Sequence, residues 1–293
     1  MRALRIKGLM KKYRGFTLGP LSLDLDPGTV VGYVGPNASG KTTTFRCLTQ
    51  LTRPDAGSAE IFGQENRPDS PDWKFDVGFV GDNHAFFEKC TGEANLRFRS
   101  RFYPTWSDAL AKDLARRFEC PLDKKAKDMS TGNRVKLSLI SAFAHSPRLL
   151  LLDEPTAGLD PVVRQEVLDV LFEILEDGER SILYATHILT DIARLADELV
   201  FLVDGKLLQR SSKDDLLDKW RRITFRLSGN AESIAGAVAA KQDGEDHQVI
   251  SIDAEETMKD LRTRQAGAIQ ATRMTVEEIA VEILKGGRNV AHN

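Results

Sequence analysis

The sequence has no long apolar run, no paired cysteines and no excess of charge of either sign. No window approaches the roughly 18 consecutive apolar residues of a membrane-spanning helix. Residues 1–15 alternate charged and apolar side chains and lack the apolar stretch and small-residue cleavage site of a signal peptide. The 41 basic and 43 acidic residues nearly balance, so no global field favours a nucleic-acid partner, and none is expected.

The cysteines are few and indicate a reducing compartment. There are three, Cys47, Cys90 and Cys120, and their spacing matches no metal site or disulfide framework. We expect Cys47 to be a small core residue rather than a redox switch. The predicted location is therefore cytoplasmic. If the protein works at a membrane, another chain must provide the span.

One glycine-rich stretch carries most of the chemical information. Gly35, Gly40, Lys41 and Thr42 occupy the fixed positions of the phosphate-loop pattern, between a predicted buried strand (29–34) and a predicted helix. Backbone N–H groups, the helix dipole and the Lys41 charge favour a phosphate there. The Thr42 hydroxyl is placed to ligate Mg²⁺. The residues of the loop are Gly35, Pro36, Asn37, Ala38, Ser39, Gly40, Lys41, Thr42 and Thr43.

The remaining pattern predicts an α/β protein with two domains. Residues 2–9 are predicted to form an edge strand, and later strands alternate with helices across short loops, which argues for a mostly parallel, covered sheet. Residues 84–146 have helical spacing, with Ser107 as a plausible N-cap, and indicate an inserted helical subdomain. We expect a main domain over 1–211 and a small α+β accessory domain over 212–293.

Two adjacent carboxylates follow the hydrophobic strand predicted at 148–152. We expect Asp153 to emerge beside the phosphate-loop strand and to hold Mg²⁺, through water. Glu154 lies one residue further on, where a general base could polarise an attacking water. The alternative is a pair of solvent-exposed loop charges.

A second anion site is predicted at residues 130–132. Ser130, Thr131 and Gly132 precede a helical pattern, so Ser130 can cap the helix while free N–H groups face an anion. The alternative is an ordinary capped helix.

The order of these motifs resembles the ATP-binding subunit of an ABC transporter. The phosphate loop comes first, then Ser130–Gly132, then residues 153–160 (DEPTAGLD), then a strand that ends in Thr186-His187. The resemblance covers about residues 1–210. It departs from the family at Thr131 and Asn133, where Gly and Gln are commoner. The aromatic-rich segment up to residue 106 looks most like bacterial ABC ATPases that serve separate, exporter-type permeases.

The resemblance implies a P-loop NTPase core of ABC type with an antiparallel β edge, working as a head-to-tail dimer. The dimer would be a homodimer, or a heterodimer with a related ATPase. ATP and Mg²⁺ would lie between residues 35–43 of one chain and residues 130–132 of the other. His187 would reach the γ-phosphate beside Glu154; the alternative is a satisfied strand-end histidine. Asp160 would bridge the two sites, cap the following helix, or both. Tyr13 would stack on adenine, or be a core or edge tyrosine.

One position departs from the family's usual glutamine after the strand at 77–80. Asp82 takes that place and could contact Mg²⁺ or its water, while Asn83 could supply the amide. Phe86 and Phe87 follow directly. They either line a groove for a permease segment or pack the helical subdomain.

The resemblance therefore implies an ATP-hydrolysing motor docked on a separate integral membrane permease, peripheral on the cytoplasmic face and exporting substrate. A soluble ABC ATPase acting on ribosomes or DNA is one alternative. A regulatory nucleotide-binding subunit with weak hydrolysis is another, supported by Asp82 alone. Residues 274–286 resemble the closing helix of exporter-type subunits, where they would regulate, stabilise the dimer, or only pack.

Overall fold

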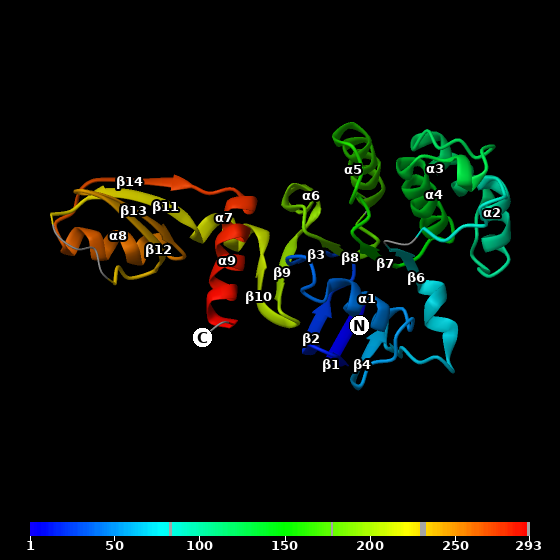
Figure 1. The fold of residues 1–293 in the computed structure, drawn as a ribbon, viewed down its shortest axis with the longest axis horizontal. Coiled ribbons are helices and arrows are strands. Elements are labelled where there is room, and N and C mark those ends of the chain that lie inside the picture. The colour runs from blue at the N-terminus through cyan, green and yellow to red at the C-terminus, as the bar shows by residue number, and fades with distance from the viewer. Residues whose placement is uncertain (82–83, 177, 229–232, 292–293) are drawn as a thin grey trace. The chain divides into compact units, whose positions relative to one another are not determined.

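The computed structural model describes residues 1–81, 84–176, 178–228 and 233–291 (Figure 1). The chain divides into two compact units, Met1–Gln209 and Arg210–Asn293, and the division falls inside strand β10. The boundary expected from the sequence, after residue 211, lies two residues further along.

A six-stranded sheet forms the centre of the first unit. Its inner strands pair in parallel, and every residue of β3 is buried, as expected for a sheet covered on both faces. The expectation that Asp153 emerges beside the phosphate-loop strand is wrong, because β8 lies between β7 and β3. In spatial order the strands are β10 (Lys206–Ser212), β9 (Glu198–Val203), β3 (Val30–Val34), β8 (Ser181–Thr186), β7 (Leu149–Asp153) and β6 (Val77–Val80).

A four-stranded antiparallel sheet packs against this centre. Its apolar residues share one core cluster with the parallel sheet and with buried side chains of α1, including Phe45 and Leu48. The prediction of an edge strand near the N-terminus is wrong, because β1 pairs with β2 on one side and β4 on the other. Alternation reports a half-buried face and carries no information about pairing at the edges. The strands are, in order, β2 (Phe16–Leu25), β1 (Leu4–Tyr13), β4 (Ala56–Ile61) and β5 (Gln64–Glu65).

Helices cover the sheets of the first unit. Figure 1 shows α2, α3 and α4 together beside β6, where the helical subdomain was expected. Ser107 accepts a hydrogen bond from Leu110 N at 3.1 Å, which confirms its predicted role as N-cap of α3. The helices are α1 (Lys41–Leu48), α2 (Gly92–Ser100), α3 (Asp108–Arg117), α4 (Thr131–Phe143), α5 (Pro161–Leu175) and α6 (Leu189–Leu195), with 3₁₀ turns at Pro71–Asp76 and Ala126–Asp128.

The second unit is a small antiparallel sheet with helices. Its strand order is β12-β13-β11-β14, and its core contains Ile223, Phe225, Val249 and Leu261. Within the described ranges, none of the helices of either unit has the length and apolarity needed to cross a bilayer. The elements are α7 (Lys213–Lys219), β11 (Arg221–Arg226), β12 (Ala237–Asp243), β13 (Asp246–Ser251), α8 (Ala254–Thr263), β14 (Gly267–Arg273) and α9 (Val276–Ala291).

Candidate functional site

The phosphate-loop residues 35–43 connect β3 to α1 in a tight turn. A Cβ added to Gly35 would lie 2.4 Å from the Leu202 carbonyl oxygen, and Gly40 has a φ of 109°. Both positions therefore require glycine. Gly40 is the N-cap of α1 and provides no side-chain cap, so the first N–H groups of this helix have no side-chain acceptor from that position. Such a helix start can bind an anion.

Lys41 is the first residue of α1, at the end of this turn, and its side chain is 6% exposed. Its ammonium donates to the carbonyl oxygens of Gly35 at 2.8 Å and Pro36 at 3.1 Å. It also lies 3.2 Å from Glu154 Oε1. The charge is thus concentrated at the loop and is shared among three oxygen acceptors of the protein.

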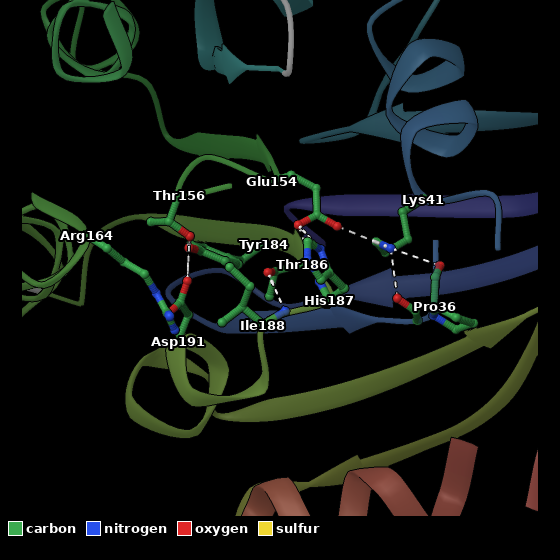
Figure 2. A network of polar contacts seen from close by, with 11 residues as sticks. Pro36, Lys41, Glu154, Thr156, Arg164, Tyr184, Thr186, His187, Ile188 and Asp191 are labelled. Carbon is green, nitrogen blue, oxygen red and sulfur yellow. Dashed lines mark hydrogen bonds and ion pairs between the residues drawn. The ribbon is translucent and has the colours of Figure 1, made fainter. Parts of the chain in front are cut away.

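Glu154 joins Lys41 to His187, as Figure 2 shows. Its carboxylate is 15% exposed, and Oε2 accepts from His187 Nδ1 at 2.8 Å and from His187 N at 3.3 Å. Because a carboxylate only accepts, this contact requires the imidazole proton on Nδ1. Glu154 follows β7 directly and His187 follows β8, so parallel pairing of these strands brings the two side chains together. The phosphate-loop lysine, the predicted general base Glu154 and the predicted γ-phosphate histidine thus form one cluster.

Asp153 and Thr42 line one pocket of about 380 Å³. The Asp153 carboxylate is 1% exposed at the end of β7, and Thr42 is the second residue of α1. A hydroxyl and a carboxylate are the hard oxygen donors that Mg²⁺ takes, so this donor set fits the predicted ion. Asp82 and Asn83, which the sequence also linked to Mg²⁺, lie outside the described residues.

Ser130, Thr131 and Gly132 lie at the start of α4 in the helical subdomain. Ser130 caps the helix by accepting from Asn133 N at 3.2 Å, which confirms the predicted cap. Ser130 and Thr131 are exposed and Gly132 is half-buried. The polar partners of Lys41 come from the phosphate loop and the segment after β7, and the start of α4 provides none of these three acceptors.

Asp160 and Tyr13 were each open to two interpretations. Asp160 is exposed and caps α5, accepting from Val162 N and Val163 N at 3.1 Å each, so the capping role is confirmed. Tyr13 ends β1 and is 46% exposed, which rules out a core tyrosine. Its register partner Phe16 lies 3.0 Å from the Cβ position at Gly40, so this hairpin end reaches the phosphate loop.

The aromatic residues after β6 divide between the two interpretations. Phe86 is half-buried with the Arg134 guanidinium 5.9 Å from its ring centroid. Phe87 is 53% exposed and meets Phe98 edge-on at 4.8 Å between centroids, and Phe98 in turn meets Phe102 at 5.2 Å. Sequence reasoning named Phe87 but missed this exposed row, although the spacing of four between Phe98 and Phe102 could have indicated it.

A buried polar network beside the cluster was also missed. Asp191 on α6 is fully buried and is bonded by Thr156, Tyr184 and Arg164. A charged residue at a core-facing helical position was the available signal. Cys47 is buried as expected, and burial raises the pKa of its thiol to about 11.

Comparisons with known proteins agree with this geometry. A family model described as ABC transporter matches residues 18–157. The ABC transporter ATP-binding protein YtrB of Bacillus subtilis (strain 168) is 34% identical over 206 residues, 70% of each chain. The daunorubicin/doxorubicin resistance ATP-binding protein DrrA of Streptomyces peucetius is 32% identical over 221 residues, 73% of this chain and 67% of that one.

Other relatives carry different names. The sulfate/thiosulfate import ATP-binding protein CysA 1 of Agrobacterium fabrum (strain C58 / ATCC 33970) is 31% identical over 225 residues, 73% of this chain and 65% of that one. Among solved structures, an ATP-binding subunit of an ABC transporter matches with a TM-score of 0.66 and 28% identity, covering 74% of this chain and 92% of that chain.

Proposed function

The chain belongs to the family of ABC transporter ATP-binding proteins and is an ATPase, and we propose that it is the motor subunit of an exporter that works as a dimer on a separate membrane permease. The observation that carries the proposal is the contact of Glu154 with both Lys41 and His187 at the phosphate loop. A nucleotide-binding module without hydrolysis has no need of a carboxylate and an imidazole at this point.

ATP binding is assigned to residues 35–43. Backbone N–H groups and the start of α1 face the phosphates, and Lys41 exchanges its carbonyl partners for phosphate oxygens. Thr42 and Asp153 would hold Mg²⁺, which supplies charge neutralisation at the β- and γ-phosphates. Tyr13, exposed at the neighbouring hairpin end, would stack on the adenine.

Hydrolysis is assigned to Glu154 and His187. When phosphate takes over the Lys41 ammonium, Glu154 Oε1 becomes available to orient a water molecule and accept its proton. The His187 contact keeps the Glu154 carboxylate directed at the loop. His187 itself is 44% exposed, and a second proton, on Nε2, would let the ring donate to the γ-phosphate while Nδ1 holds Glu154.

The dimer is proposed from two exposed helix starts. Ser130 and Asp160 cap α4 and α5 at the surface, so each can meet the nucleotide or the active site of a second chain. Free N–H groups at the start of α4, with Thr131 and Gly132, complete the γ-phosphate contact from the opposite side. The second chain is another copy or a related ATPase.

The permease is proposed to dock on the exposed row of Phe87, Phe98 and Phe102. Exposed apolar rings in contiguous contact mark interaction surfaces. The row begins directly after the segment that follows β6, so a permease segment seated there would sense the nucleotide site. We propose that the chain, bound to this permease, lies on the cytoplasmic face of the membrane. The export direction is supported by the resistance name of one relative and opposed by the import name of another.

The test is purification of the full chain from its own cells in mild detergent, with identification of the proteins that accompany it and a parallel ATPase assay. We expect a multi-span membrane protein, and hydrolysis that falls about a hundredfold or more in Glu154→Gln. Phe98→Asp should release the membrane protein with ATPase retained, whereas Val238→Asp, at a 53% exposed valine of the second unit, should not. Co-purification of ribosomes or DNA instead would sink the motor proposal, and uptake by vesicles containing the complex would reverse the direction.

A further inference from the structure

Asp191 is a fully buried carboxylate that belongs to no nucleotide-binding motif. It lies on α6, directly after the segment that contains His187. A buried carboxylate is strongly unfavourable unless donors surround it. Its Oδ2 accepts from Thr156 Oγ1 at 2.5 Å and from Tyr184 OH at 3.2 Å. Its Oδ1 accepts from Arg164 Nε at 2.8 Å and from Arg164 Nη2.

The donors of Asp191 come from the three segments that carry the proposed catalytic and interface residues. Thr156 is two residues after Glu154, and Tyr184 is three residues before His187 on β8. Arg164 lies on α5, whose N-cap is Asp160. Figure 2 shows Asp191 meeting Thr156 and Arg164 on one side of the site, with Lys41 on the other and Glu154 between.

The network holds its geometry because every partner donates toward one carboxylate. Burial raises the pKa of the Tyr184 hydroxyl well above its usual range, and the Asp191 charge adds to this, so the hydroxyl stays a donor. Arg164 presents two N–H groups in a fixed fork. A shift of α5 relative to α6 would break several of these bonds together.

A second polar tie on α5 provides a comparison. Lys136 Nζ on α4 lies 2.9 Å from Glu166 Oε2 on α5, and the lysine side chain is only 8% exposed. Both ion pairs include a residue of α5, and each contains a partly buried cation, Arg164 in one and Lys136 in the other. The pair of Lys136 and Glu166 joins two helices and includes no residue of the segments after β7 and β8.

We propose that Asp191 and Arg164 are positioning residues for ATP hydrolysis, which hold the segment from Glu154 to Asp160 in register with His187. The inference rests on the proposed roles of Glu154, His187 and Asp160. Neither Asp191 nor Arg164 belongs to the residues proposed above to bind the nucleotide. They act by joining the N-terminal part of α5 to β8 and α6, which lie on either side of His187. The segment from Glu154 to Asp160 and His187 are thereby aligned at the same time.

The experiment is steady-state ATPase kinetics and ATP-analogue binding on the full chain, with the co-purified membrane protein if one is found. Asp191→Asn keeps the shape and removes the charge. We expect kcat to fall about tenfold to a hundredfold, because small misplacement of reacting groups has effects of that size. KM and the Kd for a non-hydrolysable ATP analogue should stay within about twofold, since residues 35–43 are untouched. Glu166→Gln, the matched control, should leave both constants near wild type.

A double variant separates positioning from plain stability. If Arg164 and Asp191 act as a unit, Arg164→Gln combined with Asp191→Asn should reduce kcat no further than the stronger single variant. The inference would be overturned if the falls in kcat of the two single variants multiplied in the double variant. It would also be overturned if kcat were unchanged in Asp191→Asn, or fell equally in Asp191→Asn and Glu166→Gln.

Tyr184→Phe covers the case in which Asp191→Asn does not fold. It removes one hydroxyl and keeps the ring, and we expect a fall in kcat of about threefold with Kd unchanged, because one hydrogen bond of the set is lost. No fall in kcat would then overturn the inference. Glu154→Gln separates failure of the proposed function from failure of this inference. If Glu154→Gln retains hydrolysis, the proposed function fails. If Glu154→Gln loses hydrolysis while Asp191→Asn and Tyr184→Phe keep full activity, only this inference fails.

Discussion

The starts of α1 and α4 are both suited to an anion, but they are prepared for it in opposite ways. The start of α1 has no side-chain cap, is enclosed by the phosphate loop and contains a buried lysine. The start of α4 is exposed and capped by its own Ser130. The site at α1 is formed within one chain. At α4, the Asn133 N–H is bonded to the Ser130 hydroxyl and becomes free for a ligand only when that bond breaks. In the proposed dimer, this difference would let one fold bind the nucleotide within one chain and contact it from a second chain only when the two chains pair.

The largest expected effect separates the two helix starts by affinity. Lys41→Met should reduce hydrolysis by about a hundredfold to a thousandfold and weaken ATP binding, because a buried, directed donor is lost. Ser130→Ala should leave ATP affinity of the isolated chain within about twofold, since in the proposed dimer its helix start meets the nucleotide of the other chain. Titration calorimetry with ATP measures both. Equal losses of affinity would mean that the two helix starts serve one site in one chain.

A charge at the start of α4 tests how that helix meets the γ-phosphate. Ser130→Asp keeps a good N-cap, so the midpoint of thermal unfolding should hold, while the carboxylate repels phosphate and lowers hydrolysis about tenfold or more. Ser130→Ala gives the reverse ranking, losing about 1 kcal/mol of helix stability with a smaller fall in rate. Unfolding scans beside ATPase assays compare the pair. Full hydrolysis in Ser130→Asp would remove α4 from the reaction.

Backbone geometry at the start of α1 is the next test. Gly40→Ala must adopt a left-handed backbone and bring a methyl 2.7 Å from Leu18 Cδ1, so ATP affinity should fall about tenfold. Gly244→Ala in the second unit also places alanine at a positive φ, 62°, but with open space around it, and should leave affinity unchanged. Fluorescent-nucleotide binding distinguishes them. Unaltered affinity in Gly40→Ala would show that the loop relaxes at little cost.

The smallest effect concerns two thiols that report on the same helices. Cys47 lies on α1, and Cys120 Sγ meets the Asn133 carbonyl on α4 at 3.7 Å; burial raises the pKa of each to about 11. Unfolded thiols ionise near pH 9 while the folded ones keep their protons, so stability contributed by burial falls between about pH 9 and pH 11. Alkylation at pH 8 followed by mass spectrometry should modify exposed Cys90 first. Rapid modification of Cys47 or Cys120 would indicate local opening of that helix.

Local chemistry was predictable from the sequence, and pairing between distant segments was not. The phosphate loop, the caps at Ser107 and Ser130 and the strand before Asp153 follow from short patterns. The contact of Glu154 with His187 depends on β7 lying next to β8, and sequence periodicity carries no strand order. The same limit produced the wrong neighbour for β7 and the wrong edge position for β1.

The accessory unit shows a further limit. Only its α+β class and a closing helix over 274–286 were predicted, because β12 and β14 are mostly exposed and lack a marked apolar alternation. The network of Asp191 was missed for a different reason. The core-facing position of Asp191 on its helix could be read from the sequence, but its partners come from distant segments that the sequence does not bring together.

The contacts of Lys41 bear on which molecules the loop rejects. An ammonium has three N–H donors, and Lys41 lies within hydrogen-bonding reach of the Gly35 and Pro36 carbonyls and near Glu154. The net binding free energy of a ligand is therefore only what its contacts add beyond those that these acceptors already make with Lys41. A single inorganic phosphate replaces part of the set, whereas a triphosphate chain also reaches the N–H groups of the loop and the start of α1. We therefore expect the contacts of Lys41 with these carbonyls and Glu154 to favour a triphosphate over a single phosphate. The free phosphate abundant in cells should then leave the loop largely unoccupied.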